Sequence, residues 1–330
     1  MRTEVGTVLG SVEALLDGAE RREPLESVGK SGASLERVTI DGTAYVVKYL
    51  DREADWTIRA SGFDGFATVA LWRRGVLQAL PACIRQPVVA VAEDTVAALL
   101  MEDVSPWLVP ATDEPITVAQ NEQLMDHLAQ MHAAFWDTSL AIDVVTPTQR
   151  YLELSPSMAE AELARGSQDL VPRLVRRGWP LLAEVAPRAA SVVVPLAHDP
   201  GPLVTALAAT PQTFVHGNWK LDNLGFDDDG RTVLLDWEIP GRAAAASDLA
   251  WYLAINCRRL PVTKEATIEL YRTALERHGV DTEPWWDVQL RLSLVGALVQ
   301  FGWEKALGGY DDELAWWEEQ AVAGEVLLAR

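Results

Sequence analysis

The sequence predicts an α+β protein of two lobes, with a five-stranded antiparallel sheet in residues 1–103 and a mainly helical part in residues 104–330. Two observations favour this division. Between residues 25 and 101, short apolar segments alternate with turn residues, which is typical of an antiparallel sheet. After the proline- and acid-rich stretch 106–115, apolar residues recur at helical spacing. A chain of 330 residues can give each lobe a sizeable core.

Composition and charge narrow the classes of function. A hydrophobic content of 49% with 23% charged residues is typical of a globular protein, and the apolar stretches are too short to span a membrane. The N-terminus lacks the layout of a signal peptide, so we expect a cytoplasmic protein. Cys83 and Cys257 alone imply no disulfide framework. The net charge of −20 argues against a nucleic-acid-binding surface. It is compatible with a cationic ligand, although general surface acidity for solubility explains it more simply.

The elements of the first lobe follow from the apolar pattern. Residues 4–23 have helical spacing and predict a helix that caps the lobe. From Leu25 to Leu50 the pattern changes to strands, with a hairpin turn at Asp41-Gly42. A helix is expected over 66–80, and residues 87–92 and 96–101 complete the five strands.

The second lobe is predicted to be helical on both sides of a central stretch. Residues 121–135 carry an apolar stripe, and residues 152–185 predict helical pieces broken at Pro156, Pro172 and Pro180. Residues 263–278 and 284–329 predict further amphipathic helices. Most of the thirteen Trp residues are expected to pack between helices.

The stretch from Phe214 to Glu238 gathers most of the candidate chemistry. His216-Gly217 ends an apolar run, and a polar loop follows with Asn218, Lys220, Asp222 and Asn223. Two short strands, 224–226 and 232–235, are then joined by a turn at 227–230, so that Asp236 returns beside the loop. A loop amide and a carboxylate brought together suit Mg²⁺ bound to phosphate oxygens.

This stretch resembles the catalytic and metal loops of the aminoglycoside phosphotransferase-like kinases, which are small-molecule relatives of protein kinases. The resemblance implies a protein-kinase-like fold, ATP or GTP as phosphate donor, and Mg²⁺ as cofactor. Asn223 matches the loop Asn that binds Mg²⁺, and Asp236 matches the Asp that bridges Mg²⁺ to the phosphates. Lys220 stands where many protein kinases place a Lys that touches the transferred phosphate.

The same resemblance implies a nucleotide site in the first lobe. Ser31, Gly32 and Ser34 belong to a loop whose backbone would approach the phosphates, and an ordinary Gly-Ser turn is the alternative. Lys48 ends the third strand as Val46-Val47-Lys48, which resembles the strand whose Lys pairs with the phosphates. The backbone of residues Glu102 and Val104 would contact the adenine, although an edge strand that ends in acids explains the segment equally well.

The family pairs its strand Lys with a Glu on the next helix. Residues 66–80 have no acid, and Glu53 and Asp64 are the nearest candidates.

The later part of the chain continues the resemblance. Asp248, within Ser247-Asp248-Leu249-Ala250, matches the Asp that holds the catalytic loop through its backbone. Glu238, Trp303 and Glu304 are the candidates for contact with a small-molecule hydroxyl acceptor, such as a sugar, an amino sugar or an antibiotic-like metabolite. A solvated helix face explains Glu304 as well as a binding role does.

One position departs from the family pattern, because Asn218 stands where the catalytic Asp is expected. An amide can accept a hydrogen bond from a hydroxyl, but it cannot take the proton. Three explanations remain open. Asn218 is an engineered replacement that traps a complex, or Asp222 acts as the base, or the chain is a nucleotide-binding pseudokinase with a regulatory role. The sequence alone does not separate them.

Overall fold

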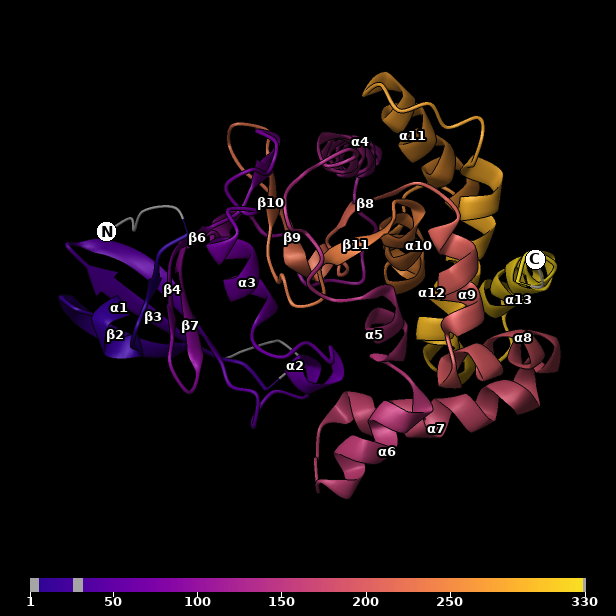
Figure 1. Cartoon of the computed structure of the whole chain (residues 1–330), viewed down its shortest axis with the longest axis horizontal. Helices are drawn as coiled ribbons and strands as arrows, with labels where there is room; N and C mark the ends of the chain where they lie inside the picture. Colours follow the sequence, from indigo (N-terminus) through magenta and orange to yellow (C-terminus); the bar gives the residue numbers. More distant parts are fainter. Residues whose placement is uncertain (1–5, 26–31, 329–330) are drawn as a thin grey trace.

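A six-stranded sheet forms the N-terminal lobe of the computed structural model, which describes residues 6–25 and 32–328 (Figure 1). The strand order is β1 (Val8–Leu9), β6 (Val88–Glu93), β7 (Ala97–Glu102), β4 (Thr43–Leu50), β3 (Ser34–Ile40) and β2 (Ala19–Leu25). The last five are antiparallel neighbours, as predicted. The sheet is nevertheless mixed, because the additional strand β1 pairs with β6 in parallel.

The helix predicted for residues 4–23 is wrong for the part that the structure describes. Only α1 (Val12–Leu15) is helical, and it begins at Ser11, whose side chain accepts a hydrogen bond from the Ala14 N–H. The residues after it form β2, an edge strand on β3. Four of its seven residues are charged, and solvent can reach all four, as is common where a sheet ends. Pairing with β3 therefore overrides the local helical spacing.

Two short helices, α2 (Trp56–Ala60) and α3 (Ala67–Arg73), connect β4 to the rest of the lobe. The predicted helix over 66–80 ends early, at Arg73. Gly75 adopts a φ of 73°, and the N–H groups of Gly75 and Val76 donate to the carbonyls of Trp72 and Leu71. These two bonds satisfy the last carbonyls of α3 and end the helix.

The C-terminal lobe is built around α12 (Trp286–Leu307), which packs against helices from several parts of the chain (Figure 1). The other helices are α4 (Val118–Ala134), α5 (Pro147–Leu152), α6 (Pro156–Ala164), α7 (Leu170–Val185), α8 (Pro187–His198), α9 (Gly201–Ala208), α10 (Ala246–Ile255), α11 (Lys264–Arg277) and α13 (Asp312–Glu325). α7 continues through Pro180, against the prediction of a break there. Both Pro180 and Arg176, whose carbonyl loses its helical partner, are exposed, so water can hydrate that carbonyl.

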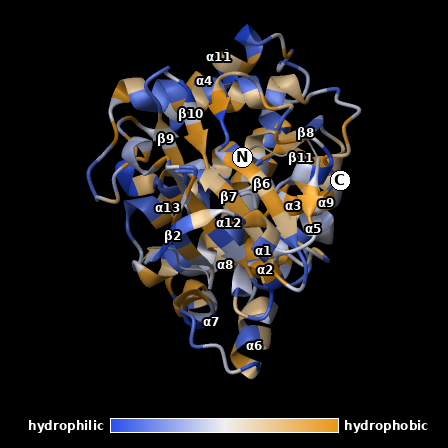
Figure 2. Ribbon diagram, turned by 90° about the vertical axis from the view of Figure 1, so that its left-hand side faces the viewer, coloured by the Kyte–Doolittle hydropathy of each residue, from blue (hydrophilic) through white to orange (hydrophobic). Residues whose placement is uncertain are grey.

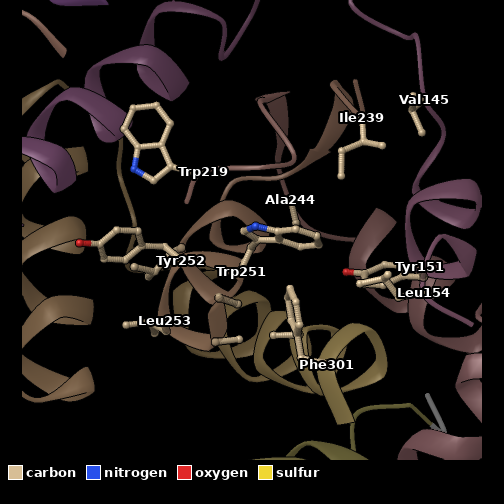
Figure 3. Packing of buried hydrophobic residues seen from close by; sticks show 14 of the residues in the cluster. Val145, Tyr151, Leu154, Trp219, Ile239, Ala244, Trp251, Tyr252, Leu253 and Phe301 are labelled. Carbon is tan, nitrogen blue, oxygen red and sulfur yellow. The ribbon is translucent and has the colours of Figure 1, made fainter. Parts of the chain in front are cut away.

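Aromatic residues fill the core of this lobe. Trp251 of α10 meets Phe301 of α12 edge to face with ring centroids 4.6 Å apart, and Tyr151 of α5 lies nearby (Figure 3). Figure 2 shows hydrophobic residues along β6 and β7 and hydrophilic residues on the edge strand β2. Within residues 6–25 and 32–328, no helix is long and apolar enough to cross a membrane.

Short strands lie between the two lobes and carry the candidate site (Figure 1). β8 (Gln212–Val215) pairs with β11 (Gly241–Ala244), and β9 (Leu224–Phe226) forms a hairpin with β10 (Thr232–Leu234). β10 also pairs in parallel with β5 (Ile84–Arg85), which precedes β6 in the chain. Three short 3-10 helices complete the structure: η1 (Ser105–Trp107), η2 (Leu221–Asn223) and η3 (Cys257–Arg259).

Candidate active site

The loop His216–Asn223, here called the central loop, follows β8 and is held by hydrogen bonds to Asp248 of α10. The Asp248 carboxylate accepts hydrogen bonds from the His216 N–H at 2.7 Å and from the Gly217 N–H at 2.8 Å. Arg150 Nη2 donates to the same carboxylate at 3.1 Å. Burial would raise the pKa of Asp248, but the His132 hydrogen bond and the Arg150 charge hold it well below its usual range. A buried anion therefore fixes the start of the loop.

His216 orders the loop as a neutral side chain. The Asn218 N–H donates to His216 Nδ1 at 3.1 Å, so Nδ1 carries no proton and Nε2–H donates to the Leu235 carbonyl at 3.0 Å. Burial lowers the pKa of His216 to about 4, which agrees with this assignment. The ring thus joins the central loop to the end of β10.

Gly217 is required by close packing. Its φ is 90°, and a Cβ atom there would lie 2.2 Å from the Ile239 carbonyl oxygen and 2.3 Å from Arg150 Nη1. The absence of a side chain lets Arg150 press against the loop directly before Asn218. Arg150 also donates to the Ile239 carbonyl at 3.3 Å.

The predicted residues of the central loop have different surroundings. Asn223 is buried, and its Nδ2 donates to the Asn218 carbonyl at 3.1 Å. Asn218 Oδ1 is buried and accepts no hydrogen bond from the part of the chain that the structure describes. Lys220 is half-buried, and its charge acts on Asp236. Asp222, the alternative base in the sequence, is exposed on η2.

The hairpin returns the acidic segment Asp236–Glu238 to the central loop and to the N-terminal lobe. The Leu235 N–H donates to the Asn223 carbonyl at 3.0 Å, and the next residue, Asp236, adopts a φ of 71°. This uncommon conformation turns the chain so that the Asp236 carboxylate meets the Lys48 ammonium of β4. Lys48 also donates to Glu238 Oε1 at 2.5 Å. Residues from both lobes therefore converge at one point.

The pKa values of the two carboxyl groups that contact Lys48 are shifted in opposite directions. Burial would raise the pKa of Asp236, but the Lys48 and Lys220 charges lower it below its usual value. Burial and the neighbouring Asp236 charge raise the pKa of Glu238. Burial alone would lower the pKa of Lys48, yet both carboxylates raise it, so Lys48 stays charged. Asp236 is the anion most available to a cation in the cleft.

The donor set fits a hard cation. Asn223 uses its Nδ2 within the loop, which leaves its amide oxygen to act as a ligand. Asp236, which follows the hairpin, offers a carboxylate that is 24% exposed. An amide oxygen and a carboxylate, completed by water and phosphate oxygens, are what Mg²⁺ accepts.

A cleft runs from Lys48 between the sheet and the hairpin. Its walls are Lys48, Thr68, Pro87, Val88, Leu99, Met101 and residues 234–237. Its walls are largely aliphatic, but the cavity is only about 20 Å³, so the sheet and the hairpin would have to move apart to admit a flat aromatic base. Glu102 and Val104 follow Met101, where the Glu102 N–H donates to the Pro87 carbonyl and Val104 is buried.

The predicted phosphate loop is only partly described. Ser31 lies outside the described residues, and Ser34 is exposed at the start of β3. Gly32 passes so close to α2 that a Cβ atom would lie 2.2 Å from the Ala54 carbonyl oxygen. Close packing alone therefore explains the glycine at position 32, whether or not a nucleotide binds there.

The partner of Lys48 differs from both candidates in the sequence. Glu53 pairs with Arg165 at 2.9 Å, and Asp64 lies 3.5 Å from Arg52 at the surface. Glu238, predicted to face the acceptor, takes the place of the expected helix Glu instead. Its second oxygen accepts a hydrogen bond from Thr57 Oγ1 of α2 at 3.0 Å.

Trp303 and Glu304 line a pocket in the C-terminal lobe. The pocket is formed by α7, η3, the end of α12 and the residues after it. Its charged residues are Arg258, Glu304, Lys305, Asp311 and Glu313, so its walls carry both signs. Trp303 is buried and donates its indole N–H to the Gln300 carbonyl at 2.9 Å, which makes it mainly a packing residue. The η3 side of the pocket adjoins the central loop, because Asn256 Oδ1 accepts from the Leu221 N–H at 3.0 Å.

Three residues of the site carried no signal in the sequence analysis. Arg150, Glu153 and Thr57 lie in short helices far from the motif in sequence. Only Glu238 had a detectable signal. It follows Asp236 by two residues, within the stretch that gathers the candidate chemistry.

Comparisons with known proteins identify the family and the fold. Residues 30–287 match the phosphotransferase enzyme family. The fold is similar to that of choline kinase LicA from Streptococcus pneumoniae, with a TM-score of 0.53 and 13% identity over 97% of this chain and 96% of that one. It is also similar to a thermostable mutant of aminoglycoside phosphotransferase APH(4)-Ia, with a TM-score of 0.51 and 13% identity over 97% and 98% of the two chains. No curated protein sequence matches the chain. The two structures establish a protein-kinase-like fold.

Proposed function

The chain belongs to the phosphotransferase enzyme family, and we propose that it transfers the γ-phosphate of ATP or GTP to a hydroxyl of a small molecule. The observation that carries the proposal is the meeting of Lys48 from one lobe with Asp236 from the other, beside Asn223. These are the three groups needed to grip a metal-bound polyphosphate.

Each group has a distinct part in holding the donor. Lys48, kept charged by Asp236 and Glu238, pairs with the phosphates when they enter, and Glu238 keeps its ammonium in place. Asn223 and Asp236 would hold Mg²⁺, which would supply charge neutralisation on the phosphate oxygens. Lys220 stabilises the negative charge on the transferred group. The base lies in the cleft lined by Val88, Leu99 and Met101, next to the backbone of residues 102–104.

The acceptor hydroxyl binds at Asn218. The buried Oδ1 of Asn218 accepts no hydrogen bond from the described residues, and buried polar atoms are rarely left unpaired. A hydroxyl donated to this oxygen would satisfy it and would be oriented toward the phosphate. The rest of the acceptor occupies the pocket lined by Glu304, Asp311 and Glu313. This pocket also contains basic side chains, and its mixed charges suit a polar molecule with several hydrogen-bonding groups.

The donor site is tested by Mg-ATP-dependent thermal stabilisation. A ligand at 100 times its Kd stabilises the folded state by about 2.7 kcal/mol. We expect wild type to be stabilised by ATP with Mg²⁺ and much less by ATP with a chelator. Asp236→Ala removes this difference, whereas the exposed Asp137→Ala keeps it. A variant Asp236→Ala that is stabilised as strongly as wild type contradicts the metal assignment.

Turnover is tested by screening hydroxylated metabolites for phosphorylated product by mass spectrometry. Asn218→Asp restores a carboxylate in the position that the family expects. If an additional base is useful there, product formation rises about tenfold or more. Wild type and Asn218→Asp that bind Mg-ATP but yield neither product nor released phosphate would contradict phosphoryl transfer and leave a nucleotide-binding protein.

A further inference from the structure

Glu153 is the exception among the buried carboxylates. The described residues include seven buried acids: Asp55, Glu153, Glu162, Asp227, Glu238, Asp248 and Glu318. Six of them accept a hydrogen bond from a backbone or side-chain donor. Glu153 is 6% exposed, its Oε2 is buried without a partner, and no hydrogen bond or ion pair of the described residues reaches it. An unpaired buried carboxyl is costly, so its persistence needs a reason.

The local structure places Glu153 one turn from a residue that contacts the central loop. Glu153 keeps helical backbone angles at the end of α5, with φ −54° and ψ −39°, so it lies one turn beyond Arg150 on the same face. The Arg150 guanidinium contacts Gly217, the residue before Asn218. Tyr151 and Leu154, on either side of Glu153, pack in the aromatic core (Figure 3). The neighbours of Glu153 are therefore fixed, and the residue lies one helical turn from the arginine whose guanidinium contacts the loop.

The charges that act on Glu153 identify its surroundings. Besides Arg150 of its own helix, they belong to Glu238, Lys220 and Asp236, which are all groups of the candidate active site. Arg150 is committed to Asp248 and the Ile239 carbonyl. Burial raises the pKa of Glu153 to about 7, against the lowering effect of the Arg150 charge. A carboxyl in that range can take a proton and release it again near neutral pH.

We propose that Glu153 is the proton acceptor for the hydroxyl that is phosphorylated, in place of the carboxylate that the chain lacks at Asn218. This assignment rests on the proposed phosphotransferase function. The acceptor oxygen forms a bond to the γ-phosphorus, the bond from that phosphorus to the bridging oxygen breaks, and the nucleoside diphosphate leaves. The hydroxyl proton passes to Glu153 and from there to solvent once the product has gone. Asn218 orients the hydroxyl, and Lys220 faces the phosphate.

The test uses water as the acceptor and measures phosphate release from Mg-ATP at saturating concentration. Glu153→Gln keeps the shape of the side chain and removes its ability to take a proton. We expect kcat to fall about 100-fold while KM for ATP stays within about twofold. Glu160→Gln, the same substitution at an exposed position of α6, is the matched control and keeps the wild-type kcat.

Rescue distinguishes a chemical role from a structural one. Adding Asn218→Asp to Glu153→Gln returns a carboxylate to the other side of the same hydroxyl, and we expect kcat to recover at least tenfold. A Glu153→Gln variant with wild-type kcat overturns the assignment while the proposed function stands. A variant that loses only affinity for ATP also overturns it. A wild type that Mg-ATP stabilises, but that releases no more phosphate than Asp236→Ala, overturns both.

Discussion

Replacing Asp248 by Asn tests the anion that holds the central loop. The carboxylate accepts from the N–H groups of His216 and Gly217, from Arg150 and from His132. An Asn side chain presents only one oxygen, and its NH₂ group would face an N–H of the loop. The substitution therefore leaves at least one backbone N–H unpaired and Arg150 buried without its anion.

The expected cost follows from this loss. Removing one partner of a buried ion pair costs about 3–5 kcal/mol. At about 2.1 cal/mol/K per residue, a chain of 330 residues has an unfolding entropy of about 0.7 kcal/mol/K, so Tm should fall by about 4–7 °C. Differential scanning calorimetry at pH 7 measures this change. The exposed Asp137→Asn is the control, and its Tm should change by less than about 1 °C.

The pH dependence gives a second measurement on the same variant. Because the folded pKa of Asp248 is lowered from 3.8, its stabilisation is complete above that pH and is lost as the pH falls further. The gap in Tm between wild type and Asp248→Asn should be constant from about pH 5 to 8 and should narrow in more acidic buffers. A fall in Tm below about 1 °C at pH 7, or a gap that widens in acid, would refute the role given to Asp248.

Three further predictions concern the lobes, the loop and the unpaired acid. Lys48→Met should abolish the stabilisation by Mg-ATP, whereas Lys264→Met, at another ion-paired lysine, should keep it; equal stabilisation of both variants would contradict the donor site. Gly217→Ala should lower stability by about 2–5 kcal/mol in urea unfolding, because strain and overlap add. Gly230→Ala, with a φ of 76° and open space around it, should lose only about 1 kcal/mol, and similar losses would argue against the close packing of Gly217. Glu153→Gln should be more stable than wild type by about 3 kcal/mol at pH 8.5, since a pKa raised from 4.5 to about 7 penalises the charged form, and the gap should close near pH 4.5. A gap that is independent of pH would show that Glu153 is not a buried titrating group.

The parts of the fold that could be predicted from the sequence depend on local pattern. The strands of the N-terminal sheet alternate or run apolar between turns, and α4 starts at a capping box on Thr117 and Gln120. The first of the five strands was predicted to begin at Leu25, whereas β2 ends there. Its residues are mostly charged, so only its pairing with β3 makes it a strand. Pro180 was misjudged because the exposure of the freed carbonyl depends on the packing of α7.

The candidate site likewise contains residues that the sequence could predict and one that it could not. Lys48, Asn223 and Asp236 could be named because they recur in a fixed order in the resemblance, and the structure brings them together. Glu153 could not be named, because a single acid in a helix carries no pattern. Its burial arises from the packing of α5 against parts of the chain that are distant in sequence, as the contact of Arg150 with Gly217 illustrates.

The pairing of β5 with β10 limits how the two lobes can move relative to each other. β5, from the segment between α3 and β6, is hydrogen-bonded to β10, which leads into Asp236. Arg85 of β5 reaches Glu102 at 2.8 Å and Asp227 at 3.3 Å, and it stacks on Trp107 at 4.4 Å from the ring centroid. Since this ladder ties the N-terminal segment to the hairpin, we expect opening to be a rotation with its axis near Arg85. A nucleotide would then be admitted from the opposite side, and the Gly32 turn would travel farther than Lys48 during each cycle.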